Sequence, residues 1–366
     1  MTSTDDLVAL LDEGLERGFF AGASATVAEA GGIVAEVYRG SARILPEAEL
    51  RDASPETLWD LASLTKPLAG AALVLALAAD RQLGLDDPAA RFSDAFRKTR
   101  FDGVTLRRLL AHRAGLAPWF PCYVRGEGRA AYVRTLAEVD PDGPPGRAVA
   151  YSCLGYLVLS EVVERVAARP LDRLFAERIA GPLGIASDLL FAPEGGDRAR
   201  GAGGEADDAT ERRMVADRRL AYAGFRTGVV NGEVNDGNAY RRAGGVALNA
   251  GLFGTARAVA AAGVAWMTRD ARLLPESLIA EAVSNATPAA EEDRGLGWQL
   301  ASTKGSAGEG LPPSSFGHTG FTGASMFVDP EGGRVHVLLA NRLHPSARAA
   351  DMNAFRRRFH ALAAAL

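Results

Sequence analysis

The feature that most constrains the fold is a long apolar segment, residues 63–79, in a chain of 366 residues. It has the length of a helix, and apolar side chains cover nearly its whole circumference, so it must be buried on every side. Pro67 suits the first turn of such a helix, where a missing backbone N–H is tolerated. The apolar run itself, residues 67–79, is too short to span a bilayer, so we expect a core helix and no membrane contact.

Two polar residues, Ser63 and Lys66, lie at the start of this buried helix. Only three of the 41 lysine and arginine residues are lysines, and a buried lysine can lose its proton whereas arginine cannot. Side chains three residues apart meet on a helix. A hydroxyl beside such an amine is the minimum for a serine nucleophile with a lysine base. The alternative is a serine that caps the helix and a lysine that extends into solvent.

Strand patterns lie near both ends of the chain and helical patterns lie between them. Each end is expected to form a hairpin: residues 23–30 with 33–39, and residues 324–328 with 335–340. We therefore predict an α+β protein whose antiparallel sheet is built from both termini and flanked by helices. The glycine-rich stretch 195–208 is expected to be a loop.

This pattern divides the chain into two lobes. Residues 1–84 with 225–366 are predicted to form the lobe that holds the antiparallel sheet, and residues 85–224 an inserted, mainly helical lobe. The active site is expected in the cleft between them.

Composition excludes several function classes. The net charge is −4, and the arginines are scattered among acidic residues, so nothing favours nucleic-acid binding. The two cysteines, Cys122 and Cys153, form no metal-binding motif, and the histidines show no ligand spacing, so we expect no metal. The acidic N-terminus lacks a signal-peptide pattern, which favours a cytoplasmic protein unless the true start lies upstream. The oligomeric state is left open.

Two further short motifs could contribute to a site. Tyr151-Ser152-Cys153 precedes a predicted helix, and a nearby cation could lower the pKa of the Tyr151 phenol enough for proton transfer. Gly317-His318-Thr319-Gly320 leads into a strand, and its two glycines permit close approach of the backbone to a ligand. In isolation, a tyrosine at a helix start is usually there for packing, and the glycine motif alone is a weak signal.

Together, these three motifs resemble those of the serine beta-lactamase and penicillin-binding-protein superfamily, which are Ser-x-x-Lys, Tyr-x-Asn and Lys-Thr-Gly. Their order and spacing agree. Further segments are similar to the class C and esterase-like branch of that superfamily: residues 58–63, 109–116, 244–246, 250–253 and 341–345. The resemblance extends from about residue 20 to 345 and implies the beta-lactamase-like fold.

The resemblance also implies roles for individual residues. Ser63 would be the acylated nucleophile, Lys66 would deprotonate it or tune its partners, and Tyr151 would relay protons and activate water. The oxyanion hole would consist of the amides of Ser63 and Phe321. Neither a metal nor an organic cofactor is implied. Five residues are expected to line the substrate site: His318, Thr319, Gly320, Cys153 and Trp119.

Two departures from the family pattern bear on the substrate. Cys153 stands where the family usually has asparagine, and a thiol is a weak hydrogen-bond donor. His318 stands where many lactamases have lysine, and a mostly neutral imidazole is a poor anchor for a lactam carboxylate. We therefore expect a serine hydrolase for small esters or amides. The alternatives are a true beta-lactamase or D-alanyl peptidase, and a non-catalytic ligand-binding relative.

Overall fold

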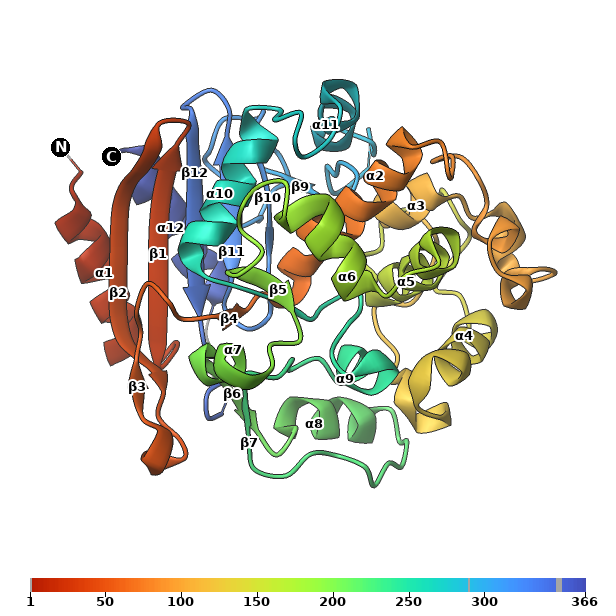
Figure 1. The fold of residues 1–366 in the computed structure, drawn as a ribbon, viewed down its shortest axis with the longest axis horizontal. Helices are drawn as coiled ribbons and strands as arrows, with labels where there is room; N and C mark the ends of the chain where they lie inside the picture. Colours follow the sequence, from red (N-terminus) through yellow and green to blue (C-terminus); the bar gives the residue numbers. More distant parts are fainter. Residues whose placement is uncertain (1, 289, 347–350) are drawn as a thin grey trace.

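The computed structural model describes residues 2–288, 290–346 and 351–366, which build one large sheet and a cluster of helices beside it (Figure 1). The sheet has seven antiparallel strands in the order β3-β2-β1-β12-β11-β10-β9. Their bounds are β1 Gly22–Glu29, β2 Gly32–Arg43, β3 Arg51–Asp52, β9 Gln299–Leu300, β10 Phe316–Thr319, β11 Ser325–Asp329 and β12 Arg334–Ala340.

The two termini meet in the middle of this sheet. Strand β1 pairs with β12, and Ala23 lies opposite Ala340. The two predicted hairpins are present as β1–β2 and β11–β12. The α+β prediction and its sheet built from both ends of the chain are thus confirmed.

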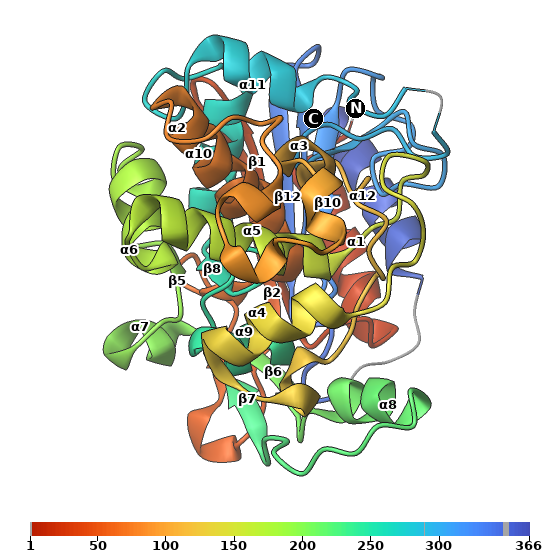
Figure 2. The ribbon, with the colours of Figure 1, turned by 90° about the vertical axis from the view of Figure 1, so that its right-hand side faces the viewer.

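Helices cover both faces of the sheet (Figures 1 and 2). Helices α1 (Thr4–Glu16) and α12 (Met352–Ala364) lie on the outer face, where Leu11, Phe355 and Phe359 pack in a separate apolar cluster. Helix α10 (Ala256–Met267) contacts β1, β11 and β12 and belongs to the larger core between the sheet and the remaining helices. Each terminal helix is amphipathic because one face packs on the sheet and the other meets water.

The apolar segment of the sequence forms the central buried helix. It runs as a 3₁₀ turn (Ala62–Leu64), a π-helical stretch (Lys66–Ala71) and helix α2 (Ala72–Ala79). The whole helix, Ala62–Ala79, has 18 residues and is apolar enough to cross a membrane by length and composition. It is thus longer than the apolar run alone indicated, but 83% of it is buried inside the protein, as expected of a core helix.

Helix α5 (Cys153–Ala167) packs against this central helix. The remaining helices are α3 Leu106–Leu110, α4 Gly128–Glu138, α6 Leu171–Phe175, α7 Gly195–Arg200, α8 Ala209–Asp217, α9 Gly237–Ala243 and α11 Glu276–Val283. Two small sheets accompany them, β4-β8-β5 and β6-β7. Their strands are β4 Trp59–Asp60, β5 Leu189–Phe191, β6 Gly203–Ala206, β7 Val229–Asn231 and β8 Leu252–Gly254.

One local prediction is wrong. The stretch 195–208 was expected to be a loop, but it contains helix α7 and strand β6. Strand β6 exists because it pairs with the distant β7, and such a long-range pairing can override the weak local preference of a glycine-rich stretch. The lobe boundaries at residues 84 and 224 stay a prediction, because α2 packs against α5 and thus joins the two parts of the chain.

A pair of histidines is buried between the sheet and α12. The rings of His336 and His360 lie 5.9 Å apart, and His360 shares a hydrogen bond of 2.7 Å with Ser325. Neither ring nitrogen of His336 has a hydrogen-bond partner among the described residues. Burial and, to a smaller extent, the charge of Arg334 together lower the pKa of His336 to about 3. His336 is therefore neutral in the folded protein.

This burial predicts a pH-dependent stability. An unfolded histidine takes up a proton below its ordinary pKa of 6.5, whereas folded His336 does so only near pH 3. The contribution of neutral His336 to the free energy of unfolding is therefore fully present above pH 6.5. It decreases by about 1.4 kcal/mol per pH unit as the pH falls from 6.5 towards 3. His336→Leu lacks this pH-dependent contribution. The free energy of unfolding of the variant relative to that of the parent should therefore rise as the pH falls from 6.5 to 4. Urea unfolding across this range measures the difference, and parallel pH profiles would contradict the prediction.

Candidate active site

Ser63 lies on a tight turn directly after strand β4. The residue before it, Ala62, has a φ of 46°, a left-handed conformation that is unfavourable for a residue with a side chain. The Ala62 amide donates to Oδ1 of Asp60 at 2.8 Å, and this bond helps to hold the turn. The Ser63 side chain is partly accessible.

Lys66 follows one helical turn later, and its ammonium points back to the serine. Its Nζ donates to Ser63 Oγ at 2.9 Å and to the carbonyl of Asn249 at 2.9 Å. A third, longer contact of 3.5 Å reaches Sγ of Cys153. Lys66 is fully buried. The alternative of a lysine that extends into solvent is therefore wrong, and the spacing of the motif brings amine and hydroxyl together as expected.

The protonation of Lys66 differs from the expectation. Burial lowers its pKa, but negative charge on the acidic groups around it, Cys153, Tyr151 and Asp236, opposes this effect because it stabilises the ammonium. The net result is a raised pKa. Lys66 therefore carries a proton in the resting protein. A free amine forms only when a proton leaves the group that these side chains make together.

Tyr151 lies against this ammonium, immediately before α5. Lys66 Nζ lies 5.0 Å from the centroid of the Tyr151 ring. Burial raises the pKa of the phenol, and the charge of Lys66 only partly lowers it. The net pKa is raised, so the resting phenol keeps its proton. The Tyr151 side chain thus lies beside the hydrogen-bonded pair of Ser63 and Lys66, an arrangement in which a proton can be transferred.

The His112 ring packs against the Tyr151 ring. Its ring centroid lies 4.6 Å from that of Tyr151, and Nδ1 accepts the amide proton of Ser152 at 3.0 Å. Burial, with the charges of Arg294 and Lys66, holds its pKa well below the usual value. A neutral His112 therefore fixes the backbone beside Tyr151.

Cys153 occupies the first position of α5. Burial raises the pKa of its thiol despite the nearby charge of Lys66. The thiol is thus protonated at neutral pH, and a protonated thiol is a poor nucleophile. This agrees with Ser63 as the attacking group. The thiol sulfur is a weak hydrogen-bond acceptor for Lys66, whereas the oxygen of a carboxamide in this position would be a strong one.

The third motif lies on strand β10, opposite Tyr151. The ring centroids of His318 and Tyr151 are 5.8 Å apart, and Nδ1 of His318 lies 2.8 Å from the Thr319 carbonyl. Burial, with the charges of Arg294 and Lys66, lowers the pKa of His318 well below its usual value. His318 is therefore a neutral wall of the site, without charge to anchor an anion.

Gly320 brings the end of β10 close to the nucleophile. A Cβ at Gly320 would lie 2.5 Å from the Leu61 carbonyl oxygen and 3.2 Å from Ala62 Cβ, so glycine is required by this close approach. Next to it, Thr322 Oγ1 donates to the Asp60 carbonyl at 2.7 Å. The turn that carries Phe321 is thus tied to the strand that precedes Ser63.

The two amides expected in the oxyanion hole belong to these two turns. Within the described residues, no hydrogen-bond acceptor satisfies the backbone N–H of Ser63 or of Phe321. Free amides beside a serine hydroxyl are the donors that stabilise the oxyanion of a tetrahedral intermediate. The geometry thus assembles a nucleophile, a proton-transfer group and two free amide donors.

Comparison with known proteins agrees with this arrangement. The family model described as Beta-lactamase matches residues 7–361. The chain belongs to the beta-lactamase family.

Relatives of this beta-lactamase-family chain have several names. A protein of Escherichia coli (strain K12) named "Putative D-alanyl-D-alanine carboxypeptidase" is 29% identical over 85% of this chain and 74% of its own length. A family VIII carboxylesterase shares the fold with a TM-score of 0.74 at 21% identity, over 98% of this chain and 97% of its own. A penicillin-binding-protein homologue from Caulobacter crescentus also has a TM-score of 0.74, at 22% identity over 99% and 97% of the two chains.

The remaining predicted site residue, Trp119, lies in the loop that touches the start of α5. The Pro118 carbonyl accepts the amide proton of Cys153 at 2.9 Å. The Trp119 ring itself is largely buried and stacks against the guanidinium of Arg218 at 4.9 Å. A role of Trp119 in substrate binding stays a prediction.

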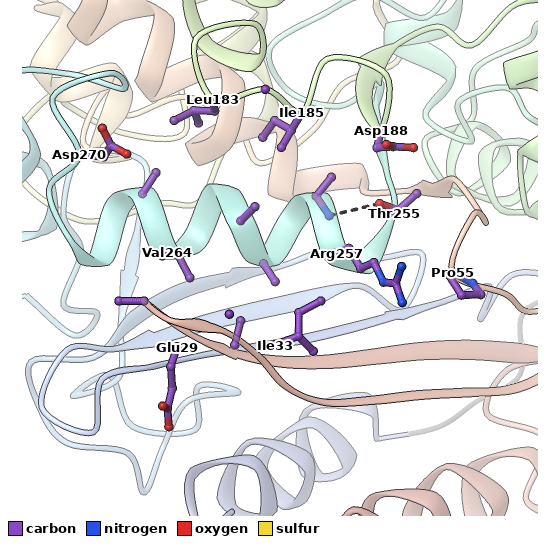
Figure 3. A pocket seen from close by; sticks show the side chains of 18 of the residues that line it. Glu29, Ile33, Pro55, Leu183, Ile185, Asp188, Thr255, Arg257, Val264 and Asp270 are labelled. Carbon is purple, nitrogen blue, oxygen red and sulfur yellow. Dashed lines mark hydrogen bonds between the residues drawn. The ribbon is translucent and has the colours of Figure 1, made fainter.

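A separate surface groove of about 930 Å³ follows α10 (Figure 3). Ile33 lines it from the β1–β2 hairpin, and Leu183 and Ile185 line it from the segment after α6. None of the predicted site residues belongs to its lining. The predicted catalytic residues of this beta-lactamase-family protein thus lie elsewhere. Among the described residues, no group of three or more His, Cys, Asp and Glu side chains could hold a metal ion.

Several residues around the site escaped the sequence analysis. Asn249 contributes a backbone carbonyl, which leaves no mark in the sequence. Arg294 lies 5.3 Å from the Tyr151 ring centroid, is buried and is paired with Glu292. Asp60 immediately precedes Leu61 in a segment that the resemblance had marked, so its role as an acceptor for Ala62 could have been considered.

The contacts of Lys66 predict the effect of a conservative change. In Lys66→Arg, we expect ester hydrolysis to fall about a hundredfold or more, because a guanidinium is larger, fills a fully buried space and cannot give up its proton. Steady-state kinetics with thermal unfolding would measure it. Lys304→Arg, the same change at an exposed position, is the control. Normal turnover in Lys66→Arg would remove Lys66 from proton transfer.

Proposed function

We propose that this serine hydrolase of the beta-lactamase family forms an acyl-enzyme on Ser63 and hydrolyses small esters or amides. The observation that carries the proposal is the 2.9 Å contact between Lys66 Nζ and Ser63 Oγ inside a buried group that also includes the Tyr151 phenol. A protein that only binds a ligand has no need to bury an ammonium beside a hydroxyl and a phenol, because this arrangement is costly without a chemical use.

The reaction begins once the Lys66–Tyr151 pair has lost one proton to solvent water. The deprotonated pair accepts the proton of Ser63, and Oγ attacks the substrate carbonyl carbon to form a tetrahedral intermediate. The amides of Ser63 and Phe321 stabilise its negatively charged oxygen. As the bond to the leaving group breaks, the pair returns the proton to the departing alcohol or amine. Water then attacks the acyl carbon while the pair takes one of its protons; the bond to Oγ breaks, the acid leaves, and the pair returns the proton to Ser63.

Esters are the favoured substrates for two reasons. Neutral His318 offers no positive charge to the carboxylate that beta-lactams carry. Cys153 lacks the carboxamide that would bind an amide carbonyl of the substrate. The likeness to a family VIII carboxylesterase supports this choice at the level of the fold.

A D-alanyl peptidase is the second candidate. The relatives from Escherichia coli and Salmonella carry the name of a D-alanyl-D-alanine carboxypeptidase. Such an enzyme shares the same acylation chemistry and differs in how the peptide end is bound, so substrate profiling decides between the two.

The first experiment tests the nucleophile and the substrate together. The purified protein is treated with a fluorophosphonate probe, a short-chain nitrophenyl ester, a chromogenic cephalosporin and a peptide that ends in D-alanyl-D-alanine. We expect labelling and ester turnover that disappear in Ser63→Ala and persist in Ser302→Ala, a change at an exposed serine. Faster release of D-alanine than of nitrophenol would favour the peptidase, and absence of labelling would refute acylation of Ser63.

The second experiment tests the departure at Cys153. In Cys153→Asn, a carboxamide replaces the thiol 3.5 Å from Lys66 Nζ and can accept from Lys66 while donating to a substrate carbonyl. One added hydrogen bond is worth about 1 kcal/mol, so cephalosporin turnover should rise roughly five- to tenfold. Cys153→Ser, which removes the thiol without adding a carboxamide, is the matched control. An unchanged cephalosporin rate in Cys153→Asn would show that the thiol does not limit lactam hydrolysis.

A further inference from the structure

Arg356 is a buried cation on the C-terminal helix, α12. It is 5% exposed, and its Nη2 donates to the carbonyls of Gly320 at 2.6 Å and Ala324 at 3.0 Å. Its Nη1 donates to Oδ1 of Asn353 at 3.1 Å. Among the described residues, no carboxylate forms an ion pair with it, and its Nε has no partner. A buried guanidinium without a counterion is costly, so its position demands a reason.

The two carbonyls that Arg356 contacts bound the turn that follows β10. Across this turn, the Gly320 amide donates to the Ala324 carbonyl at 2.7 Å, and the Gly323 amide donates to the Gly320 carbonyl at 3.1 Å. Phe321 lies inside the turn, and its amide has no acceptor among the described residues. Arg356 therefore fixes the turn through its two carbonyls and leaves the Phe321 amide free to donate to a ligand.

The Gly320 carbonyl and the Phe321 amide are the two ends of one peptide unit. Electron density is shared between the oxygen and the nitrogen of a peptide by resonance. A cation at the oxygen draws density from the nitrogen, which makes the N–H a stronger hydrogen-bond donor, as in other polarised hydrogen-bond chains. Burial and, to a smaller extent, the charge of Arg342 together lower the pKa of Arg356 to about 9. Arg356 thus remains charged at neutral pH.

We propose that Arg356 is a positioning residue for the oxyanion hole, which directs the Phe321 amide and strengthens it as a donor through the Gly320 carbonyl. The inference rests on the proposed acylation of Ser63. When Ser63 Oγ forms its bond to the carbonyl carbon, the π electron pair moves onto the substrate oxygen, and the polarised amide stabilises that charge. Arg356 neither gives nor takes a proton, and it touches neither Ser63 nor the substrate.

Two substitutions separate charge from hydrogen bonding. Arg356→Gln keeps a donor for the Gly320 carbonyl but removes the charge, and Arg356→Lys keeps the charge. Removal of a whole oxyanion donor costs about a hundredfold or more in kcat, so weakening one should lower kcat about tenfold in Arg356→Gln, with KM unchanged. Arg356→Lys should recover part of this loss. Arg358→Gln, on the same helix as Arg356, breaks an exposed ion pair with Glu13 of α1; it is the control and should match the parent.

The infrared stretching frequency of the acyl carbonyl in the acyl-enzyme reports on the hydrogen bonds of the oxyanion hole. It would not change if Arg356 only stabilised the fold. We expect the infrared band of the trapped acyl carbonyl to shift to higher wavenumber in Arg356→Gln and to lie between this value and that of the parent in Arg356→Lys. Thermal unfolding confirms that the compared variants are folded, and Arg356→Lys alone carries the test if Arg356→Gln does not fold. An unshifted band, or an unchanged kcat, in a folded variant overturns the role of Arg356. A parent protein without Ser63-dependent turnover refutes the proposed function instead.

Discussion

The structure depends on the burial of one ammonium group. Lys66 lies at zero exposure, and a charge in that position is tolerated only if all its protons find acceptors. Its partners come from three separate segments: the Ser63 turn, the first residue of α5 and the loop at Asn249. These segments must converge for the ammonium to be satisfied. The same convergence places hydroxyl, phenol and amine within reach of one another, so the requirement for stability and the requirement for chemistry coincide.

A second set of contacts connects this group to the sheet. Asp60 binds the Ala62 amide through one carboxylate oxygen and both nitrogens of Asn235 through the other, while its backbone carbonyl accepts from Thr322. One residue thus couples the strained turn before Ser63 to the turn that holds Phe321. The hydrogen bonds of Arg356 hold that second turn from the opposite side. The spacing of the two free amides is therefore set by contacts that never reach the substrate.

The sequence predicted the parts of this site that depend on short spacing. The separation of three positions between Ser63 and Lys66 brings the two side chains together on any helix, and the hairpins follow from local periodicity. The protonation of Lys66 was not predictable, because it depends on Cys153 and Tyr151, which are distant in sequence. The carbonyl of Asn249 was missed because a backbone group has no residue signature. Arg294 and Arg356 were missed because many arginines occur in the chain and only the fold distinguishes buried from exposed ones.

Burial first, and then the positive charges around Ser63, explain why the two histidines beside it are neutral. Lys66 and Arg294 both lower the pKa of His112 and of His318, so these imidazoles sense a positive field that burial reinforces. A positive field favours any step in which negative charge develops, and the oxyanion of a tetrahedral intermediate is such a charge. Because the cations are held by fixed carbonyl and carboxylate partners, they need not reorganise when that charge forms. A protonated His318 would add to the field, but its cost in this buried position is prohibitive. The site therefore relies on lysine and arginine for charge and uses histidine for shape and hydrogen bonding.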